Sequence, residues 1–219
     1  MPGPPQAGHH RDRTDPAWGP ESAEGWLDSY LSAAAVMDLL RTYDGPSYDA
    51  VVMAGFWEHG REGVRELVDV PVVDITEAAA HLSQSAGPPL RRRHHAGTVL
   101  RPDRGQPGAG GGGPQLRGRG GDGARCPGPG RTRPARRRHS LTAAERARAA
   151  GAEVLVLGCA GMTGLQRAVG EKLGLPVVDG VGAAVKLAES LVGLGLRTSR
   201  AGSYGRPVPK RRTWGEAPR

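Results

Sequence analysis

Aromatic side chains are scarce in this chain. Phenylalanine, tyrosine and tryptophan make up 4% of its 219 residues, with a single phenylalanine, whereas there are 35 glycines and 19 prolines. The length would allow one compact unit, but this composition is poor material for a large core, so we expect the chain to be diluted by a stretch that does not pack. Neither a membrane-spanning apolar run nor a charged-then-apolar leader is found, so we expect a cytoplasmic protein without membrane contact.

Cysteine is also scarce, and Cys126 and Cys159 are the two in the chain. They stand in very different contexts, so a disulfide framework is not expected. No spacing of cysteine and histidine matches a zinc site. We therefore do not expect a bound metal.

Acidic residues are too few to balance the basic ones, and the formal net charge is +8. Much of the arginine lies in residues 83–140, a segment rich in arginine, glycine and proline with almost no aliphatic periodicity. This composition predicts disorder and is typical of polyanion binding. However, no aromatic residue is interleaved to stack on bases, and no recognition fold surrounds the arginines, so nucleic acid is disfavoured as a partner.

The most informative stretch is Val154–Met162, in which an apolar run leads into a glycine-containing turn. The run predicts a buried strand of a parallel sheet, and the glycines around Cys159 permit a tight turn after it. The apolar spacing over residues 163–173 predicts a helix that ends at Gly174. Cys159 is therefore expected at the start of this helix.

A thiol at a helix N-terminus faces the positive end of the helix dipole and backbone N–H groups without internal partners. Both favour the thiolate, and the N–H groups can also hold an enolate-like oxygen. Cys159 is therefore a candidate for proton transfer. The alternative, from these residues alone, is an inert cysteine buried in the core, which is common.

A similar block stands earlier in the chain. Residues 48–56 and 60–79 run strand, glycine turn, helix and then a Pro-Val-Val-Asp strand, and residues 154–189 repeat this order. With the motifs Gly-Cys-Ala-Gly-Met and Leu-Pro-Val-Val-Asp-Gly-Val, the chain resembles the aspartate/glutamate/hydantoin racemase superfamily, most closely hydantoin and allantoin racemases. The resemblance covers residues 16–82 and 141–205.

The resemblance implies an α/β fold of two similar lobes, each a parallel sheet flanked by helices, with the substrate site between them. It also implies a homo-oligomer. The expected segments are a non-family N-terminal part (1–15), a first lobe (16–82), the low-complexity segment (83–140), the remainder of the second lobe (141–180), and a C-terminal helix and tail packing back on the first lobe (181–219). The family's opening strand and Asn-Pro-Asn turn are not found in the first of these.

The implied activity is cofactor-independent racemisation, in which a proton moves at the carbon next to a carbonyl of a small hydantoin-like substrate. In the family, one cysteine from each lobe faces this carbon. Cys159 matches the second-lobe cysteine, whereas Gly55 stands at the first-lobe position. Glycine has no group that can carry a proton.

Several hypotheses follow from this departure. Glu58 or His59 could supply the missing acid or base, although the alternative, that Glu58-His59-Gly60 caps the following helix, is favoured. Without a replacement, Cys159 would protonate one face only, as in arylmalonate decarboxylase, a relative with glycine at the first position. A hypothesis of another class is an inactive remnant or a basic polyanion-binding protein.

Further residues around these motifs are expected to bind substrate. The expected set is Phe56, Gly158, Ala160, Gly161, Thr163, Asp179 and Gly180. Thr163 could either cap the helix or bind a substrate carbonyl oxygen. Asp179 lies at the carboxyl end of a strand, where α/β proteins bind ligands, and Asp74 holds the matching place in the first block. The alternative for both aspartates is an N-cap, and it is favoured for Asp74.

Residues 83–140 stand where the family places part of its second lobe. Codons exist for residues 88–96 that, read one base later, encode Arg-Arg-Tyr-Gly-Val-Val-Thr-Thr-Leu, a credible buried strand. Codons also exist for residues 103–107 that, read one base later, encode Ile-Glu-Asp-Ser-Leu. GC-rich codons translated out of frame also yield an excess of arginine, glycine and proline. We therefore predict that this segment is a frameshifted translation, in which Cys126 has no structural or redox role.

Overall fold

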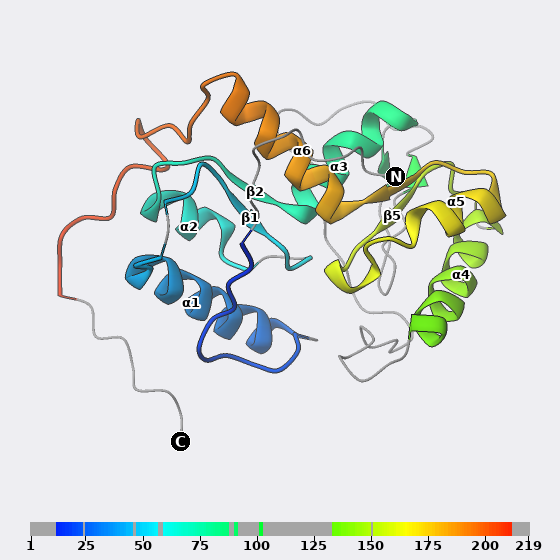
Figure 1. Cartoon of the computed structure of the whole chain (residues 1–219), viewed down its shortest axis with the longest axis horizontal. Helices are drawn as coiled ribbons and strands as arrows, with labels where there is room; N and C mark the ends of the chain where they lie inside the picture. The colour runs from blue at the N-terminus through cyan, green and yellow to red at the C-terminus, as the bar shows by residue number, and fades with distance from the viewer. Residues whose placement is uncertain are drawn as a thin grey trace. The chain divides into compact units, whose positions relative to one another are not determined.

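The computed structural model describes residues 12–23, 25–45, 47–56, 59–87, 90–91, 101–102, 133–149 and 151–211 (Figure 1). Residues 1–11, Glu58, Cys126 and most of the low-complexity segment lie outside the described residues. Within the described ranges, no helix is both long enough and apolar enough to cross a membrane.

Helices and short strands alternate along the chain, as expected for an α/β protein. The elements are α1 (Trp26–Thr42), β1 (Val51–Met53), α2 (Arg61–Leu67), β2 (Val72–Asp74), α3 (Ile75–Ala86), β3 (Leu90–Arg91), β4 (Arg101–Pro102), α4 (Arg133–Ala149), β5 (Leu155–Leu157), the 3-10 helix η1 (Ala160–Met162), α5 (Gln166–Leu173), β6 (Val177–Asp179) and α6 (Gly180–Gly193). Strand β1 pairs with β2, β3 with β4, and β5 with β6.

The two similar sequence blocks form similar backbone structures. The N–H of Val51 donates to the carbonyl of Pro71 at 2.9 Å, and the N–H of Leu155 donates to that of Pro176 at 3.0 Å. Strands β5 and β6 run parallel. In each block a helix separates the paired strands and another helix follows the second strand directly. The order of elements predicted from the repeated Pro-Val-Val-Asp motif is therefore confirmed.

The helix predicted over residues 163–173 differs from the observed structure. A single turn of 3-10 helix, η1, follows Cys159, and α5 begins only at Gln166. Gly164 lies between them with φ of 88°, which interrupts the helical backbone. Cys159 therefore precedes a three-residue helix, whose few aligned peptide dipoles support a thiolate less than the predicted α-helix would. The predicted end at Gly174 is confirmed.

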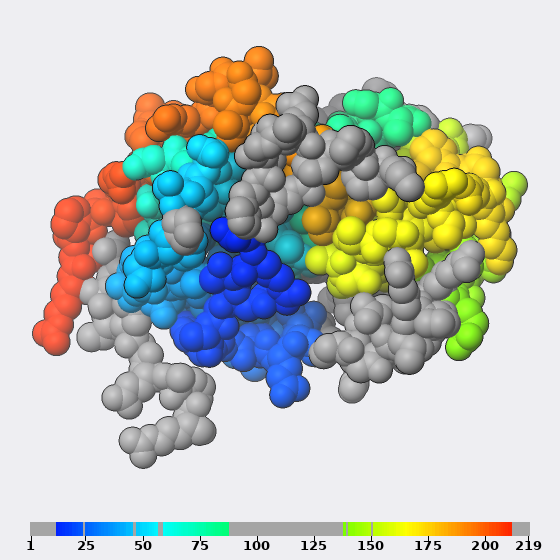
Figure 2. All heavy atoms as spheres, in the orientation of Figure 1, coloured from blue at the N-terminus to red at the C-terminus, as the bar shows by residue number. Residues whose placement is uncertain are grey.

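Apolar spacing over residues 27–41 predicts an amphipathic helix with Leu31, Ala34, Val36, Leu39 and Leu40 on its apolar face. Helix α1 agrees with this range but not with this apolar face. Ser29 and Ala35 are its buried residues, whereas Leu31 is 40% exposed. Small side chains allow α1 to pack closely on α2, and larger ones remain at the margin. Trp26 stacks on Tyr30 at the exposed end of α1, with ring centroids 6.0 Å apart. Helix α1 forms part of the surface seen in Figure 2 (blue).

The sequence of residues 141–149 predicts a helix, and helix α4 contains it but begins earlier, at Arg133. Arginine is a good helix former, and proline is tolerated in a first turn, so the sequence from Arg133 does not oppose a helix. The latter part of α4 carries Ala144 and Ala147 into the core, as its apolar spacing predicts.

The described residues divide into two compact units. The first contains residues 52–56, 73–87, 90–91, 101–102, 133–149 and 151–187, and the second contains residues 12–23, 25–45, 47–51, 59–72 and 188–211. The boundary passes through β1 and β2, so the carboxyl ends of these strands belong to the first unit together with β5 and β6.

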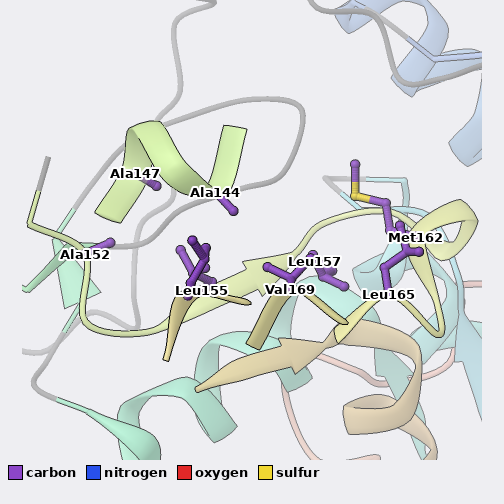
Figure 3. Packing of buried hydrophobic residues seen from close by; sticks show 9 residues of the cluster. Ala144, Ala147, Ala152, Leu155, Leu157, Met162, Leu165 and Val169 are labelled. Carbon is purple, nitrogen blue, oxygen red and sulfur yellow. The ribbon is translucent and has the colours of Figure 1, made fainter. Parts of the chain in front are cut away.

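Strand β5 is the centre of the first unit. Leu155 and Leu157 point to one side, where α4, η1 and α5 cover them (Figure 3). Val156 points to the other side, where it packs with Ala79 of α3 and with Val178 of β6. This alternation is the ordinary two-residue period of a strand, and here both faces are buried. The members of the first cluster are Ala144, Ala147, Ala152, Leu155, Leu157, Met162, Leu165, Val169 and Leu173.

In the second unit, α1 packs on α2 and the chain after α6 returns to α2. Gly60 precedes α2 with φ of 84°, and a Cβ there would lie 2.8 Å from the Cβ of Ala33 in α1, so only glycine fits. The Arg200 side chain bonds to backbone carbonyls at the end of α2, those of Arg65, Glu66 and Val68.

Tyr204 strengthens this contact by donating its hydroxyl to Glu62. Burial raises the pKa of the Glu62 carboxyl, but hydrogen bonds from Tyr204 and Arg61 outweigh it, and the pKa lies below its ordinary value. The returning segment, coloured orange to red in Figures 1 and 2, is thus held by charged and backbone hydrogen bonds.

We expect the fold to depend on the β5 cluster. Leu155 is 2% exposed, so Leu155→Ala removes buried methyl groups and leaves a cavity, which typically costs about 2–5 kcal/mol. Leu194 is 73% exposed, and Leu194→Ala should change the free energy of unfolding by less than about 0.5 kcal/mol. Urea unfolding of both variants measures the difference. Equal effects would contradict the placement of β5 in the core.

Candidate active site

The carboxyl ends of β1, β2, β5 and β6 meet in the first unit. Phe56, just after β1, packs against the cluster of Ala79 in α3 and Val156 in β5, and Val178 of β6 packs against the same cluster. Chain segments from both sequence blocks therefore share one small region. In α/β proteins, ligands bind beyond the carboxyl ends of the strands.

Gly180 is where the two blocks come into closest contact. A Cβ on Gly180 would lie 3.1 Å from the carbonyl oxygen of Ile75 and 3.4 Å from that of Leu157. The start of α6, the start of α3 and the end of β5 therefore touch at a residue without a side chain. Gly180 is buried and serves this packing contact.

The two aspartates both cap helices, but in different surroundings. Asp74 is 1% exposed, and its Oδ1 accepts the N–H of Glu77 at 2.8 Å. The predicted capping role of Asp74 is therefore confirmed. Asp179 is half-buried, and its Oδ1 accepts the N–H of Val181 at 3.2 Å. Of this pair, Asp179 is the one a ligand can reach.

Asp179 also receives a hydrogen bond from the turn that follows Cys159. The hydroxyl of Thr163 donates to Asp179 Oδ1 at 3.3 Å. Thr163 is exposed and ends η1, while Cys159 begins it. This bond links the Cys159 turn directly to the end of β6. No local pattern predicts this bond, because the partners are 16 residues apart and each has a local capping role as an alternative.

Cys159 carries a thiol, not a disulfide, in a partly buried position. Its carbonyl accepts the N–H of Met162 at 2.9 Å, which closes the η1 turn. The Cys159 side chain packs against the edge of the β5 cluster. It is thus neither sealed in the core, as an inert cysteine would be, nor fully exposed. This position suits a thiol that meets a small ligand at the end of β5.

The remaining expected site residues fall into three groups. Gly158 and Ala160 flank Cys159 and are half-buried, while Gly161 is exposed on the same turn. Gly55 and Phe56 belong to the same unit as Cys159. His59 belongs to the second unit, where Gly60 rather than His59 is the N-cap of α2.

Sequence reasoning missed Ile75 and Ala79 at the site. Ile75 is fully buried with its carbonyl against Gly180, and Ala79 packs beside Phe56. The identical Pro-Val-Val-Asp motif in both blocks was the available signal, because equivalent junctions in a repeat often face each other. In the part of the chain that the structure describes, no three acidic, histidine or cysteine side chains gather closely enough to hold a metal ion.

Comparison with known proteins gives consistent results. The family model described as Asp/Glu/hydantoin racemase matches residues 4–92 and 125–188. The hydantoin racemase of Paenarthrobacter aurescens is 34% identical over 210 residues, which are 90% of this chain and 84% of that protein. The hydantoin racemase of Rhizobium meliloti is 33% identical over 213 residues, with 90% and 83% covered.

Solved structures agree with these sequence matches. The allantoin racemase of Pseudomonas fluorescens superposes with a TM-score of 0.67 at 39% identity, covering 91% of this chain and 85% of that one. The allantoin racemase of Klebsiella pneumoniae gives a TM-score of 0.66 at 25% identity, covering 91% and 82%. The resemblance first suggested by the repeated motifs is confirmed, and the chain belongs to the Asp/Glu/hydantoin racemase family of isomerases.

Proposed function

We propose that this protein moves a proton at the carbon next to a carbonyl of a small hydantoin-like molecule, without a cofactor, and that Cys159 is the group that carries it. The observation that supports this most directly is the position of Cys159, a partly buried thiol at the carboxyl end of β5. The hydantoin and allantoin racemases similar to this chain support the substrate class.

The chemistry needs few groups. The Cys159 thiolate removes the proton from the substrate carbon, which leaves the electron pair delocalised onto the neighbouring carbonyl oxygen as an enolate. The thiol so formed then returns a proton to the same carbon. Phe56, packed against β5 and β6 at the same strand ends, offers an apolar surface for the substrate. We also expect, from the family resemblance, that the protein works as a homo-oligomer.

The stereochemical outcome depends on Gly55. Racemisation in both directions requires an acid or base on each face of the carbon, because one group does not readily reach both. Gly55 holds the first-lobe position and carries no such group. Glu58 and His59 remain candidates for the second group. The absence of a side chain at Gly55 favours a second candidate function, protonation of one face only, as in arylmalonate decarboxylase.

The family match passes over residues 93–124, which lie inside the low-complexity segment. This supports the hypothesis that the segment is a frameshifted translation. We expect sequencing of the coding DNA through the codon of Leu141 to find single-base changes that restore an aliphatic strand of the second lobe. An unchanged frame would contradict this and would favour the hypothesis of an inactive remnant.

Cys159→Ser should lower proton transfer to the uncatalysed rate, a fall of at least about 100-fold, because serine is far weaker as an acid or base in this role. The measurement is exchange of the ring C–H of 5-benzylhydantoin in heavy water, followed by proton NMR with a protein-free reference. Cys126→Ser is the matched control and should leave the rate unchanged. Full activity of Cys159→Ser would rule out this thiol as the catalytic group.

Gly55→Cys should raise racemisation relative to exchange, because it places a second thiol at the first-lobe position. In the unaltered protein, one-sided transfer would incorporate deuterium with little loss of optical rotation. Gly55→Cys should bring the two rates together, while Gly55→Ser, of similar size, should not. Polarimetry and NMR on the same samples provide both rates. Equal rates in the unaltered protein would show that another residue, such as Glu58 or His59, already serves the second face.

A further inference from the structure

Thr163 and Asp179 form a hydrogen-bonded pair with a defined direction. Asp179 Oδ1 accepts the backbone N–H of Val181 at 3.2 Å and the hydroxyl of Thr163 at 3.3 Å. With two donors directed at it, this oxygen acts purely as an acceptor. The N-cap bond fixes Asp179 at the start of α6, and Asp179 in turn fixes the hydroxyl of Thr163.

The direction of this bond decides what Thr163 can offer a ligand. A hydroxyl has one proton and two lone pairs, and the proton of Thr163 is used toward Asp179. The Thr163 side chain is exposed, so its lone pairs face outward as acceptors. Thr163 in this state accepts an N–H or O–H from a ligand but does not donate to a carbonyl oxygen.

Thr163 lies close enough to Cys159 for one small molecule to reach both. Cys159 is the N-cap and Thr163 the C-cap of η1, so the two are separated along its axis by about 8 Å at the rise of a 3-10 helix. A five-membered ring can contact the thiol with one atom and form a hydrogen bond to Thr163 with the adjacent atom. These two contacts together cover much of this distance.

From these contacts we infer that Thr163 determines specificity at the Cys159 site by accepting a hydrogen bond from a substrate N–H, and that Asp179 is the positioning residue that fixes its direction. The inference rests on the proposed function for the location of the substrate. It assigns Thr163 the opposite role to the binding of a carbonyl oxygen. A hydantoin ring has an N–H beside its acidic carbon, whereas an arylmalonate has none, so the pair favours the former.

Calorimetric titration with two probes tests this assignment. The probes are 5-benzylhydantoin and its derivative methylated at the ring nitrogen next to the acidic carbon. Thr163→Val keeps the shape but removes the acceptor, so it should weaken binding of the first probe about 3- to 10-fold and leave the second unchanged. Thr163→Ser keeps the hydroxyl and should retain the preference for the N–H probe.

Asp179→Asn tests the positioning role. Asparagine is a good N-cap, so α6 should keep its start, but its amide can donate as well as accept. The Thr163 hydroxyl then loses its fixed direction, and the preference for the N–H probe over the methylated one should shrink by a similar factor. Urea unfolding of each variant checks that the fold is retained.

Equal weakening of both probes in Thr163→Val would overturn the inference, because Thr163 would then act through shape alone. Failure of 5-benzylhydantoin to bind the unaltered protein would overturn it as well. Calorimetry measures binding without turnover, so these outcomes do not depend on the proposed function. The proposed function itself would be contradicted by an unchanged exchange rate in Cys159→Ser. A retained N–H preference in Cys159→Ser would support the inference whatever the catalytic group.

Discussion

The close contact at Gly180 is the constraint on which the site depends. The carbonyl oxygens of Ile75 and Leu157 both approach this residue so closely that a side chain would have to displace backbone. Backbone atoms cannot rotate away as a side-chain end can, so the start of α6, the start of α3 and the end of β5 are mutually fixed. Cys159 lies two residues beyond the end of β5 at Leu157, and Asp179 immediately precedes Gly180. The thiol turn and the carboxylate are therefore placed by a single backbone contact rather than by their own flexible side chains.

The two blocks repeat in backbone but differ at each chemically important position. Asp74 is sealed from solvent, and its capping bond to Glu77 is the compensation that a buried carboxylate requires. Asp179 caps its helix in the same way but stays accessible and also holds Thr163. Likewise Cys159 follows the strand of one block, whereas Gly55, without a side chain, follows the matching strand of the other. Under the proposed function, the second block therefore carries the groups that act on a ligand.

The strands were predictable because the β-branched runs before Asp74 and Asp179 are nearly identical, and short runs of this kind are typical of strands. The capping role of Asp74 was predictable from the same motif. The interruption after Cys159 was not, since apolar spacing continues across Gly164 and only its backbone angle ends the turn. The apolar side of α1 was misjudged because Ala35 and Ser29, rather than its leucines, allow the closest packing. The bond between Thr163 and Asp179 depends on the tertiary positions of two separate segments, which local sequence patterns do not predict.

The shortness of η1 bears on how Cys159 can work. An α-helix at this position would have favoured the thiolate through its dipole, but a three-residue 3-10 turn aligns few peptide groups and gives little such support. The thiol form donates a proton to an enolate. A larger share of Cys159 is therefore expected in the thiol form than at the start of the predicted α-helix. Removal of a proton from carbon depends on the thiolate, whereas protonation of an enolate depends on the thiol. Under the proposed function, the short turn therefore supports delivery of a proton to one face, the step that Cys159 completes alone when Gly55 holds the first-lobe position.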